Sequence, residues 1–154
     1  HNFKKTLKKM KNIKTYKIPR FPKKRKVGNR SWGEEILLNV IPKKISLKLL
    51  KIKKNKKGGL QYHRKKNECG YILKGKLKII YVNKNGKLTH KNLKKGDCFH
   101  FPPKSIHQEI AITDCEIIEA STPHFNDRVR VENKYGLKSV NGLKTTKYSE
   151  IKFL

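Results

Sequence analysis

The amino-acid sequence predicts an all-β protein with one domain, folded as a β-sandwich or a jelly-roll barrel. From about residue 36 onward, short apolar or alternating segments follow one another at close spacing, separated by turn residues. This pattern is typical of such folds. Before about residue 125, no stretch of ten or more residues carries the apolar stripe of a helix. The 154 residues are enough for one hydrophobic core and too few for two comfortable ones.

The first predicted strand covers residues 36–41, which are apolar and precede Pro42. Residues 45–52 alternate in part, which predicts a strand with an apolar inner face. Two glycines at 58–59 separate this strand from a polar segment at 60–68. The pair Asn85-Gly86 is typical of a type I′ hairpin turn. The remaining predicted strands are residues 71–73, 77–82, 87–90, 98–101, 105–112 and 115–120.

The two ends of the chain differ from its middle. Residues 1–28 are basic and contain two prolines, and we expect them to form an N-terminal arm. Residues 29–136 hold the predicted strands and form the barrel. We expect residues 137–154 to be a tail that packs on the barrel or on a partner.

The chain is strongly basic, with 40 Lys and Arg against 11 Asp and Glu and a formal net charge of +29. Only six of the 40 are arginine, and abundant Lys, Asn and Ile are typical of AT-rich coding. We therefore interpret most of the charge as a solvated surface, with attraction to polyanions as the alternative. Aromatic residues are sparse in residues 1–28, so specific nucleic-acid binding is not expected.

Three cysteines without a C-x-x-C spacing predict no disulfide framework. No apolar run approaches the ~20 residues of a membrane helix, and the N-terminus lacks the apolar core of a signal peptide. We therefore expect a cytoplasmic protein that does not bind membranes.

A candidate metal site combines Gln61, His63, Glu68 and His107. Residues two apart in a strand share a face, so Gln61 and His63 point the same way, while the other two come from different strands. Such nitrogen and oxygen ligands suit a divalent metal, zinc first, with manganese, iron or nickel as alternatives. Spacing alone does not separate His107 from His100. We expect ordinary roles for His1, His90, His100 and His124.

The same residues are similar to the two sequence motifs of the cupin superfamily. Gln61 and His63 stand where cupins have an H-x-H pair, and Glu68 is followed by Gly75 at the family interval. The second motif resembles Gly96, Pro102 and His107, although Lys104 and Ala111 stand where Gly and Asn are usual. This resemblance implies a single-domain jelly-roll barrel, also called a double-stranded β-helix, with a metal in its interior.

Within the cupins, the chain looks most like the type II mannose-6-phosphate isomerase group, including the cupin part of mannose-1-phosphate guanylyltransferases. The likeness spans about residues 30–136 and is carried by the segments 30–33, 60–68, 118–121 and 127–136. It also implies that Gln61 is a zinc ligand. One departure is Arg64-Lys65-Lys66, which fills a His-rich run of that group.

The resemblance implies a metal-dependent enzyme that acts on a phosphorylated or nucleotide-linked sugar, as an aldose–ketose isomerase of the mannose-6-phosphate isomerase type. The expected catalytic residues are Arg130, Glu132 and Glu109, and the expected phosphate ligands are Arg130, Arg64 and Lys65. The alternatives are a non-catalytic sugar-binding cupin module and a cupin dioxygenase. We expect a homodimer, because exposed edge strands of such barrels often pair.

Overall fold

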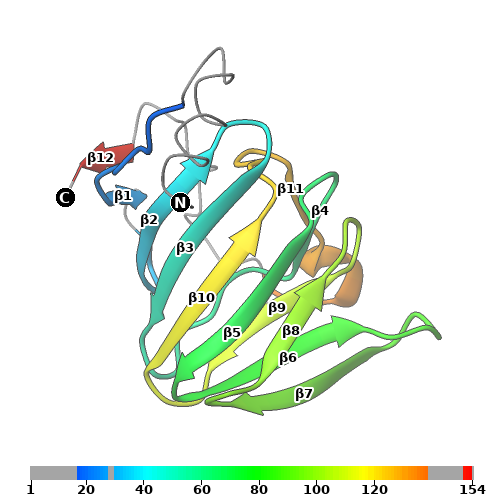
Figure 1. Ribbon diagram of the computed structural model, residues 1–154. Helices are drawn as coiled ribbons and strands as arrows, with labels where there is room; N and C mark the ends of the chain where they lie inside the picture. The colour runs from blue at the N-terminus through cyan, green and yellow to red at the C-terminus, as the bar shows by residue number, and fades with distance from the viewer. Residues whose placement is uncertain (1–16, 28–29, 139–150, 154) are drawn as a thin grey trace, which may run out of the picture.

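A computed structural model, which describes residues 17–27, 30–138 and 151–153, shows a barrel of antiparallel strands (Figure 1). No α-helix occurs in these residues, and the one 3-10 helix is η1 (Glu132–Tyr135). The all-β prediction is therefore confirmed. The strands are β1 (Arg25–Val27), β2 (Gly33–Ile41), β3 (Ile45–Ile52), β4 (Gln61–His63), β5 (Glu68–Lys74), β6 (Lys76–Val82), β7 (Leu88–Lys94), β8 (Cys98–Phe101), β9 (His107–Ala111), β10 (Cys115–Ser121), β11 (Arg128–Arg130) and β12 (Ile151–Phe153).

The strands form two sheets that face each other, as in a jelly roll. One sheet has the order β12-β1-β2-β3-β10-β5-β8, and the other has the order β11-β4-β9-β6-β7. Sequence-distant strands such as β3 and β10 are therefore direct neighbours. Among the described residues, no helix is both long and apolar enough to span a bilayer.

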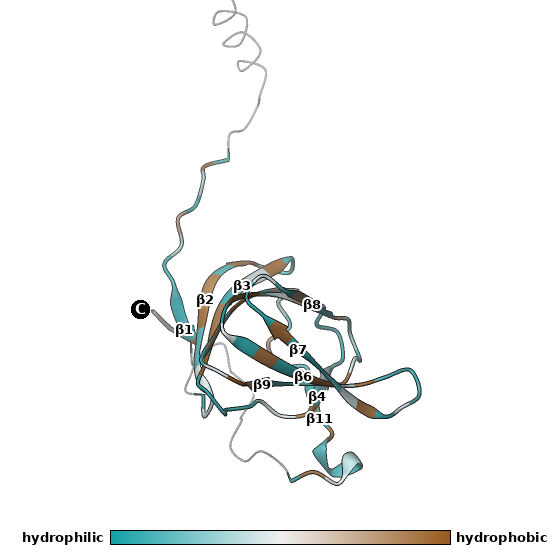
Figure 2. Ribbon diagram, turned by 90° about the horizontal axis from the view of Figure 1, so that it is seen from below, coloured by the Kyte–Doolittle hydropathy of each residue, from teal (hydrophilic) through white to brown (hydrophobic). Residues whose placement is uncertain are grey.

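The predicted arm and tail both contribute to the first sheet. β1, at the end of the predicted arm, pairs antiparallel with β2 on one side and with β12 on the other. Residues 17–24 extend away from the barrel before β1 (Figure 2). Residues 1–16, 28–29, 139–150 and 154 lie outside the described part of the chain.

Glycine is required at two positions of the motifs. Gly33 has a φ of 146° and Gly75 a φ of 87°, a region that other residues rarely adopt. A Cβ at Gly33 would fall on the backbone carbonyl of Lys51, and one at Gly75 on that of Asp114. The two motif glycines thus let neighbouring backbones approach each other closely.

The apolar core fills only one half of the barrel interior. It is formed by inward-facing residues of both sheets, which exclude water and provide most of the hydrophobic stabilisation. Trp32 and Phe99 pack against it. The buried members are Leu50, Ile52, Ile72, Leu77, Ile79, Leu93, Phe101, Ala111, Cys115 and Ile117.

The other half of the interior is polar. On β3 the buried positions are Ser46 and Lys48 followed by Leu50 and Ile52, so the inner face is apolar only at one end of the strand. The register of β3 with β10 places Ser46 opposite Ser121 and Lys48 opposite Glu119. Because the polar ends of neighbouring strands meet at the same end of the barrel, they form one buried polar region.

A buried carboxylate with two cationic partners closes one side of this region. Glu35 on β2 accepts hydrogen bonds from Arg30 Nε and Lys48 Nζ, both at 2.7 Å. Burial alone would raise the pKa of Glu35, but Lys48 and Arg30 outweigh it and lower the pKa to about 2. The charged carboxylate therefore stabilises the fold at neutral pH.

Acid should weaken the fold through Glu35. Because its pKa lies below the usual 4.5, its contribution is present above pH 4.5 and is lost as the pH falls toward 2. The shift corresponds to about 3 kcal/mol. We expect the free energy of unfolding, measured with urea across this range, to depend on pH less steeply in Glu35→Gln than in wild type. The exposed Glu34→Gln serves as the control; equal slopes in wild type and Glu35→Gln would contradict the assignment.

Candidate metal centre

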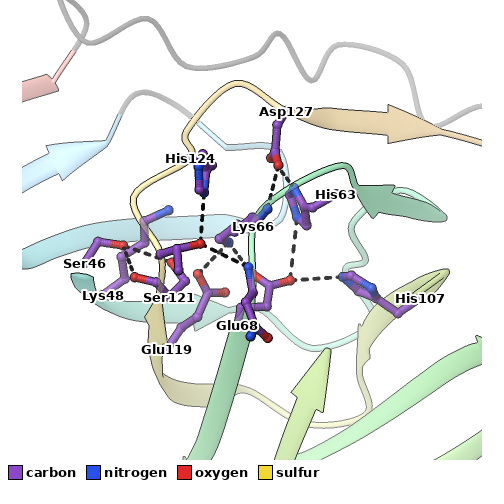
Figure 3. A network of polar contacts seen from close by, with 12 residues as sticks. Ser46, Lys48, His63, Lys66, Glu68, His107, Glu119, Ser121, His124 and Asp127 are labelled. Carbon is purple, nitrogen blue, oxygen red and sulfur yellow. Dashed lines mark hydrogen bonds and ion pairs between the residues drawn. The ribbon is translucent and has the colours of Figure 1, made fainter. Parts of the chain in front are cut away.

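The polar half of the barrel contains a cavity of about 80 Å³. Its lining includes all four predicted metal ligands, Gln61, His63, Glu68 and His107, and also Glu109. Figure 3 shows His63 and His107 pointing toward Glu68 from different strands. The structure therefore brings together side chains that are up to 46 positions apart in the chain.

Strand pairing positions these residues. Gln61 on β4 lies opposite His107 on β9, and His63 lies two residues further along β4, so the three side chains share the inner face. Glu68 is the first residue of β5 in the facing sheet. One ligand atom from each of His63, Glu68 and His107 lies within 4.8 Å of the others.

The distances fit a metal ion. Glu68 Oε1 lies 3.3 Å from His107 Nε2 and 3.6 Å from His63 Nε2. Two ligand atoms that each bind a tetrahedral ion at about 2.0–2.1 Å are about 3.3–3.4 Å apart. Gln61 Oε1 is buried and has no hydrogen-bond partner among the described residues, as expected for an oxygen that is a metal ligand.

Both histidines are oriented through their second ring nitrogen. His63 Nδ1 lies 2.9 Å from Asp127 Oδ1, and His107 Nδ1 lies 3.0 Å from the carbonyl oxygen of Ser105. The ring of His107 also stacks on Phe101 at a centroid distance of 3.8 Å. Such contacts fix the tautomer that leaves Nε2 available to a metal.

The protonation states also suit a metal. Burial lowers the pKa of His63 to about 4, against the opposing effect of Glu68. The imidazole is therefore neutral at pH 7 and has a free lone pair. Burial would raise the pKa of Glu68, but Lys66 and the histidines hold it well below its usual range. His63 and Glu68 could thus bind a divalent ion without first losing a proton.

Lys66 is part of this site, although the sequence indicated only a basic run. Its side chain is buried, and Nζ contacts Glu68 Oε2 and lies 2.9 Å from Glu119 Oε1 (Figure 3). Burial alone would lower the pKa of Lys66, but the two carboxylates hold it above its usual range. Lys66 therefore occupies one oxygen of Glu68 and leaves the other facing the histidines.

Glu109, a predicted catalytic residue, lies inside the cavity. It follows His107 by two residues on β9 and shares its face. Its Oε1 is buried without a hydrogen-bond partner among the described residues. Burial, reinforced by Glu119 and Glu68, raises the pKa of Glu109 to about 8.

The other predicted functional residues do not line the cavity. Arg130 Nη1 lies 3.6 Å from the buried Glu132 Oε1, behind Gly59. Arg64 and Lys65 are exposed, and the backbone N–H of Lys65 donates to Asp127. The lining instead includes Arg128, which the sequence analysis did not single out. Arg128 lies opposite His63 in the β4–β11 pair, and the sequence alone does not give the register of this pair.

The cavity lining includes His107 and not His100. His100 is exposed on β8, and its Nε2 lies 2.7 Å from Asn67 Oδ1. His90 is also exposed. His124 reaches the cavity lining, where its Nδ1 lies 2.9 Å from Thr122 Oγ1.

Comparison with known proteins places this barrel in a family. The family model described as cupin matches residues 42–141. A germin-like protein of Arabidopsis thaliana, subfamily 2 member 5, is 38% identical over 60 residues, which are 38% of this chain and 28% of that protein. The match thus spans less than a third of this relative.

Solved structures share the fold at low sequence identity. Oxalate decarboxylase from Bacillus subtilis superposes with a TM-score of 0.62 and 15% identity, covering 82% of this chain and 39% of that one. KdgF from a Halomonas species gives a TM-score of 0.55 and 17% identity, covering 64% and 87% of the two chains. With its two-sheet barrel, its matched motifs and its interior His, Glu and His cluster, the chain belongs to the cupin family.

Proposed function

We propose that this protein is a metal-dependent enzyme that acts on a phosphorylated or nucleotide-linked sugar, as an aldose–ketose isomerase with mannose 6-phosphate as the first substrate to test. The observation that carries the proposal is the cavity in which a ligand set suited to a metal lies beside Glu109. The motif segments at 30–33 and 127–136 support the sugar-phosphate branch of the cupins.

The cavity supplies the groups that this chemistry needs. Moving a carbonyl group between two sugar carbons requires a base that removes a carbon-bound proton and an acid that returns it. Glu109 is the carboxyl group of the predicted catalytic set that lines the cavity, and it shares a face with His107. A divalent ion held by Gln61, His63, Glu68 and His107 would act as a Lewis acid toward the sugar oxygens.

The metal site can be tested by metal content. Protein purified without added metal should contain nearly one divalent ion, zinc first, per chain. His63→Ala combined with His107→Ala should lose it, because two of the four ligands are gone. Elemental analysis measures the metal, and circular dichroism measures whether the strands persist.

A matched control removes two histidines outside the site. His90→Ala combined with His100→Ala alters exposed side chains and should leave the metal content unchanged. A wild-type protein that remains metal-free after reconstitution would rule out the metal-dependent enzyme.

The role of Glu109 can be tested by removing its ability to ionise. Glu109→Gln should lower the isomerisation rate of mannose 6-phosphate by about 100-fold or more, because a positioned acid–base group contributes ~10²–10⁴-fold. Incorporation of solvent deuterium at C2 measures the proton transfer directly, and the metal content should not change. Glu34→Gln, which alters an exposed carboxylate, should keep the full rate. Unimpaired exchange in Glu109→Gln would assign the base to another group.

A non-catalytic sugar-binding module is the second candidate, and Lys66 favours it. Its ammonium already balances the negative charge of the Glu68 carboxylate, so this carboxylate does not need a metal ion as its counter-charge. This candidate predicts sugar binding that is unaffected by chelators and the absence of turnover with any metal.

The homodimer stays a prediction. The outer face of the seven-stranded sheet exposes Ile45, Tyr71 and Leu73, and apolar side chains of this size on one sheet face often mark a contact surface.

A further inference from the structure

The charges in the cavity are not fully paired. Arg30 and Lys48 share Glu35, and Lys66 contacts Glu68 and Glu119. Arg128 also lines the cavity, but its guanidinium makes no hydrogen bond or ion pair with any residue in the described part of the chain. Its Nε is buried without a partner there.

An unpaired buried guanidinium destabilises a fold unless a ligand compensates it. Burial lowers the pKa of Arg128, which shows the same penalty on its charged form. Arg128 Nε is therefore a buried donor without an acceptor among the described residues.

The position of Arg128 connects this charge to the metal ligands. Arg128 lies directly opposite His63 in the antiparallel β4–β11 pair, and directly opposed side chains project to the same face about 5 Å apart at Cβ. A ligand in the cavity can therefore contact the guanidinium and the ligand set at once.

We propose that Arg128, rather than Arg130, binds the anionic group of the substrate. A guanidinium offers two parallel N–H donors that match the oxygens of a phosphate or a carboxylate. This inference rests on the proposed function for the sugar part of the ligand, but anion binding at Arg128 does not require that the sugar be isomerised. Arg130 is held at Glu132 outside the lining.

Calorimetric titration of the metal-loaded full chain tests the proposal with three probes: mannose 6-phosphate, mannuronate and mannose. Wild type should bind at least one anionic sugar more tightly than mannose, and comparison of the phosphate with the carboxylate identifies which group Arg128 takes. In Arg128→Met, this preference should fall by about 30-fold or more, whereas metal content should not change. Arg20→Met, which removes an exposed arginine of the arm, should behave as wild type.

A stability measurement separates ligand binding from a structural role. Without ligand, Arg128→Met should melt at or above the wild-type temperature, because an apolar side chain replaces an uncompensated charge. Arg128→Lys should keep part of the preference for an anionic sugar, since lysine keeps the positive charge but lacks the two parallel N–H donors of the guanidinium.

Two results would overturn the proposal: wild type with no preference for an anionic sugar, or Arg128→Met with an undiminished preference. Anion binding at Arg128 without isomerisation would refute the proposed reaction alone. Isomerisation that persists in Arg128→Met would refute this inference alone.

Discussion

The contact of Lys66 with two carboxylates is the interaction on which the polar half of the barrel depends. Glu68 and Glu119 come from neighbouring strands of one sheet, β5 and β10, and both are buried. Two buried carboxylates that share a site repel each other. The Lys66 ammonium contacts both of them and offsets this repulsion. The basic segment at 64–66 is a departure from the mannose-6-phosphate isomerase group. Its third residue, Lys66, is buried in the barrel, whereas Arg64 and Lys65 are exposed at the surface.

This arrangement also shapes the candidate metal site. Because Lys66 engages Oε2 of Glu68, only Oε1 faces the two histidines. A bound ion would therefore meet one carboxylate oxygen, two imidazole nitrogens and one amide oxygen, a set in which the carboxylate is the single anionic ligand. Such a set leaves the ion strongly positive, which favours polarisation of a substrate oxygen. Asp127 supports the same site from outside the cavity. It contacts His63 and accepts hydrogen bonds from the backbone N–H groups of Lys65 and Lys66.

The division of the interior explains how one small barrel holds both a core and a site. The inward-facing rows of β3 and β10 are apolar at one end and polar at the other; in β10, Cys115 and Ile117 are followed by Glu119 and Ser121. The apolar half provides the hydrophobic stabilisation. The polar half destabilises the fold wherever a buried polar atom lacks a hydrogen-bond partner, and Arg128 Nε and Glu109 Oε1 are such atoms of the lining among the described residues. These two residues are also the ones to which we assign substrate contacts, as is common for perturbed groups in cavities.

The sequence by itself determined the all-β class and most of the strands, because strand alternation is a local property of the chain. It predicted Gln61, His63, Glu68 and His107 as metal ligands, but spacing alone left His100 as an alternative to His107. Only the tertiary structure decided between His100 and His107, placed Lys66 and Arg128 in the cavity and kept Arg130 and Glu132 out of it. Those placements depend on which strands pair and in what register, such as Arg128 opposite His63. The register between distant segments arises from packing of the whole barrel. The sequence therefore does not show which residues of a lysine run or an arginine pair face solvent and which face the interior.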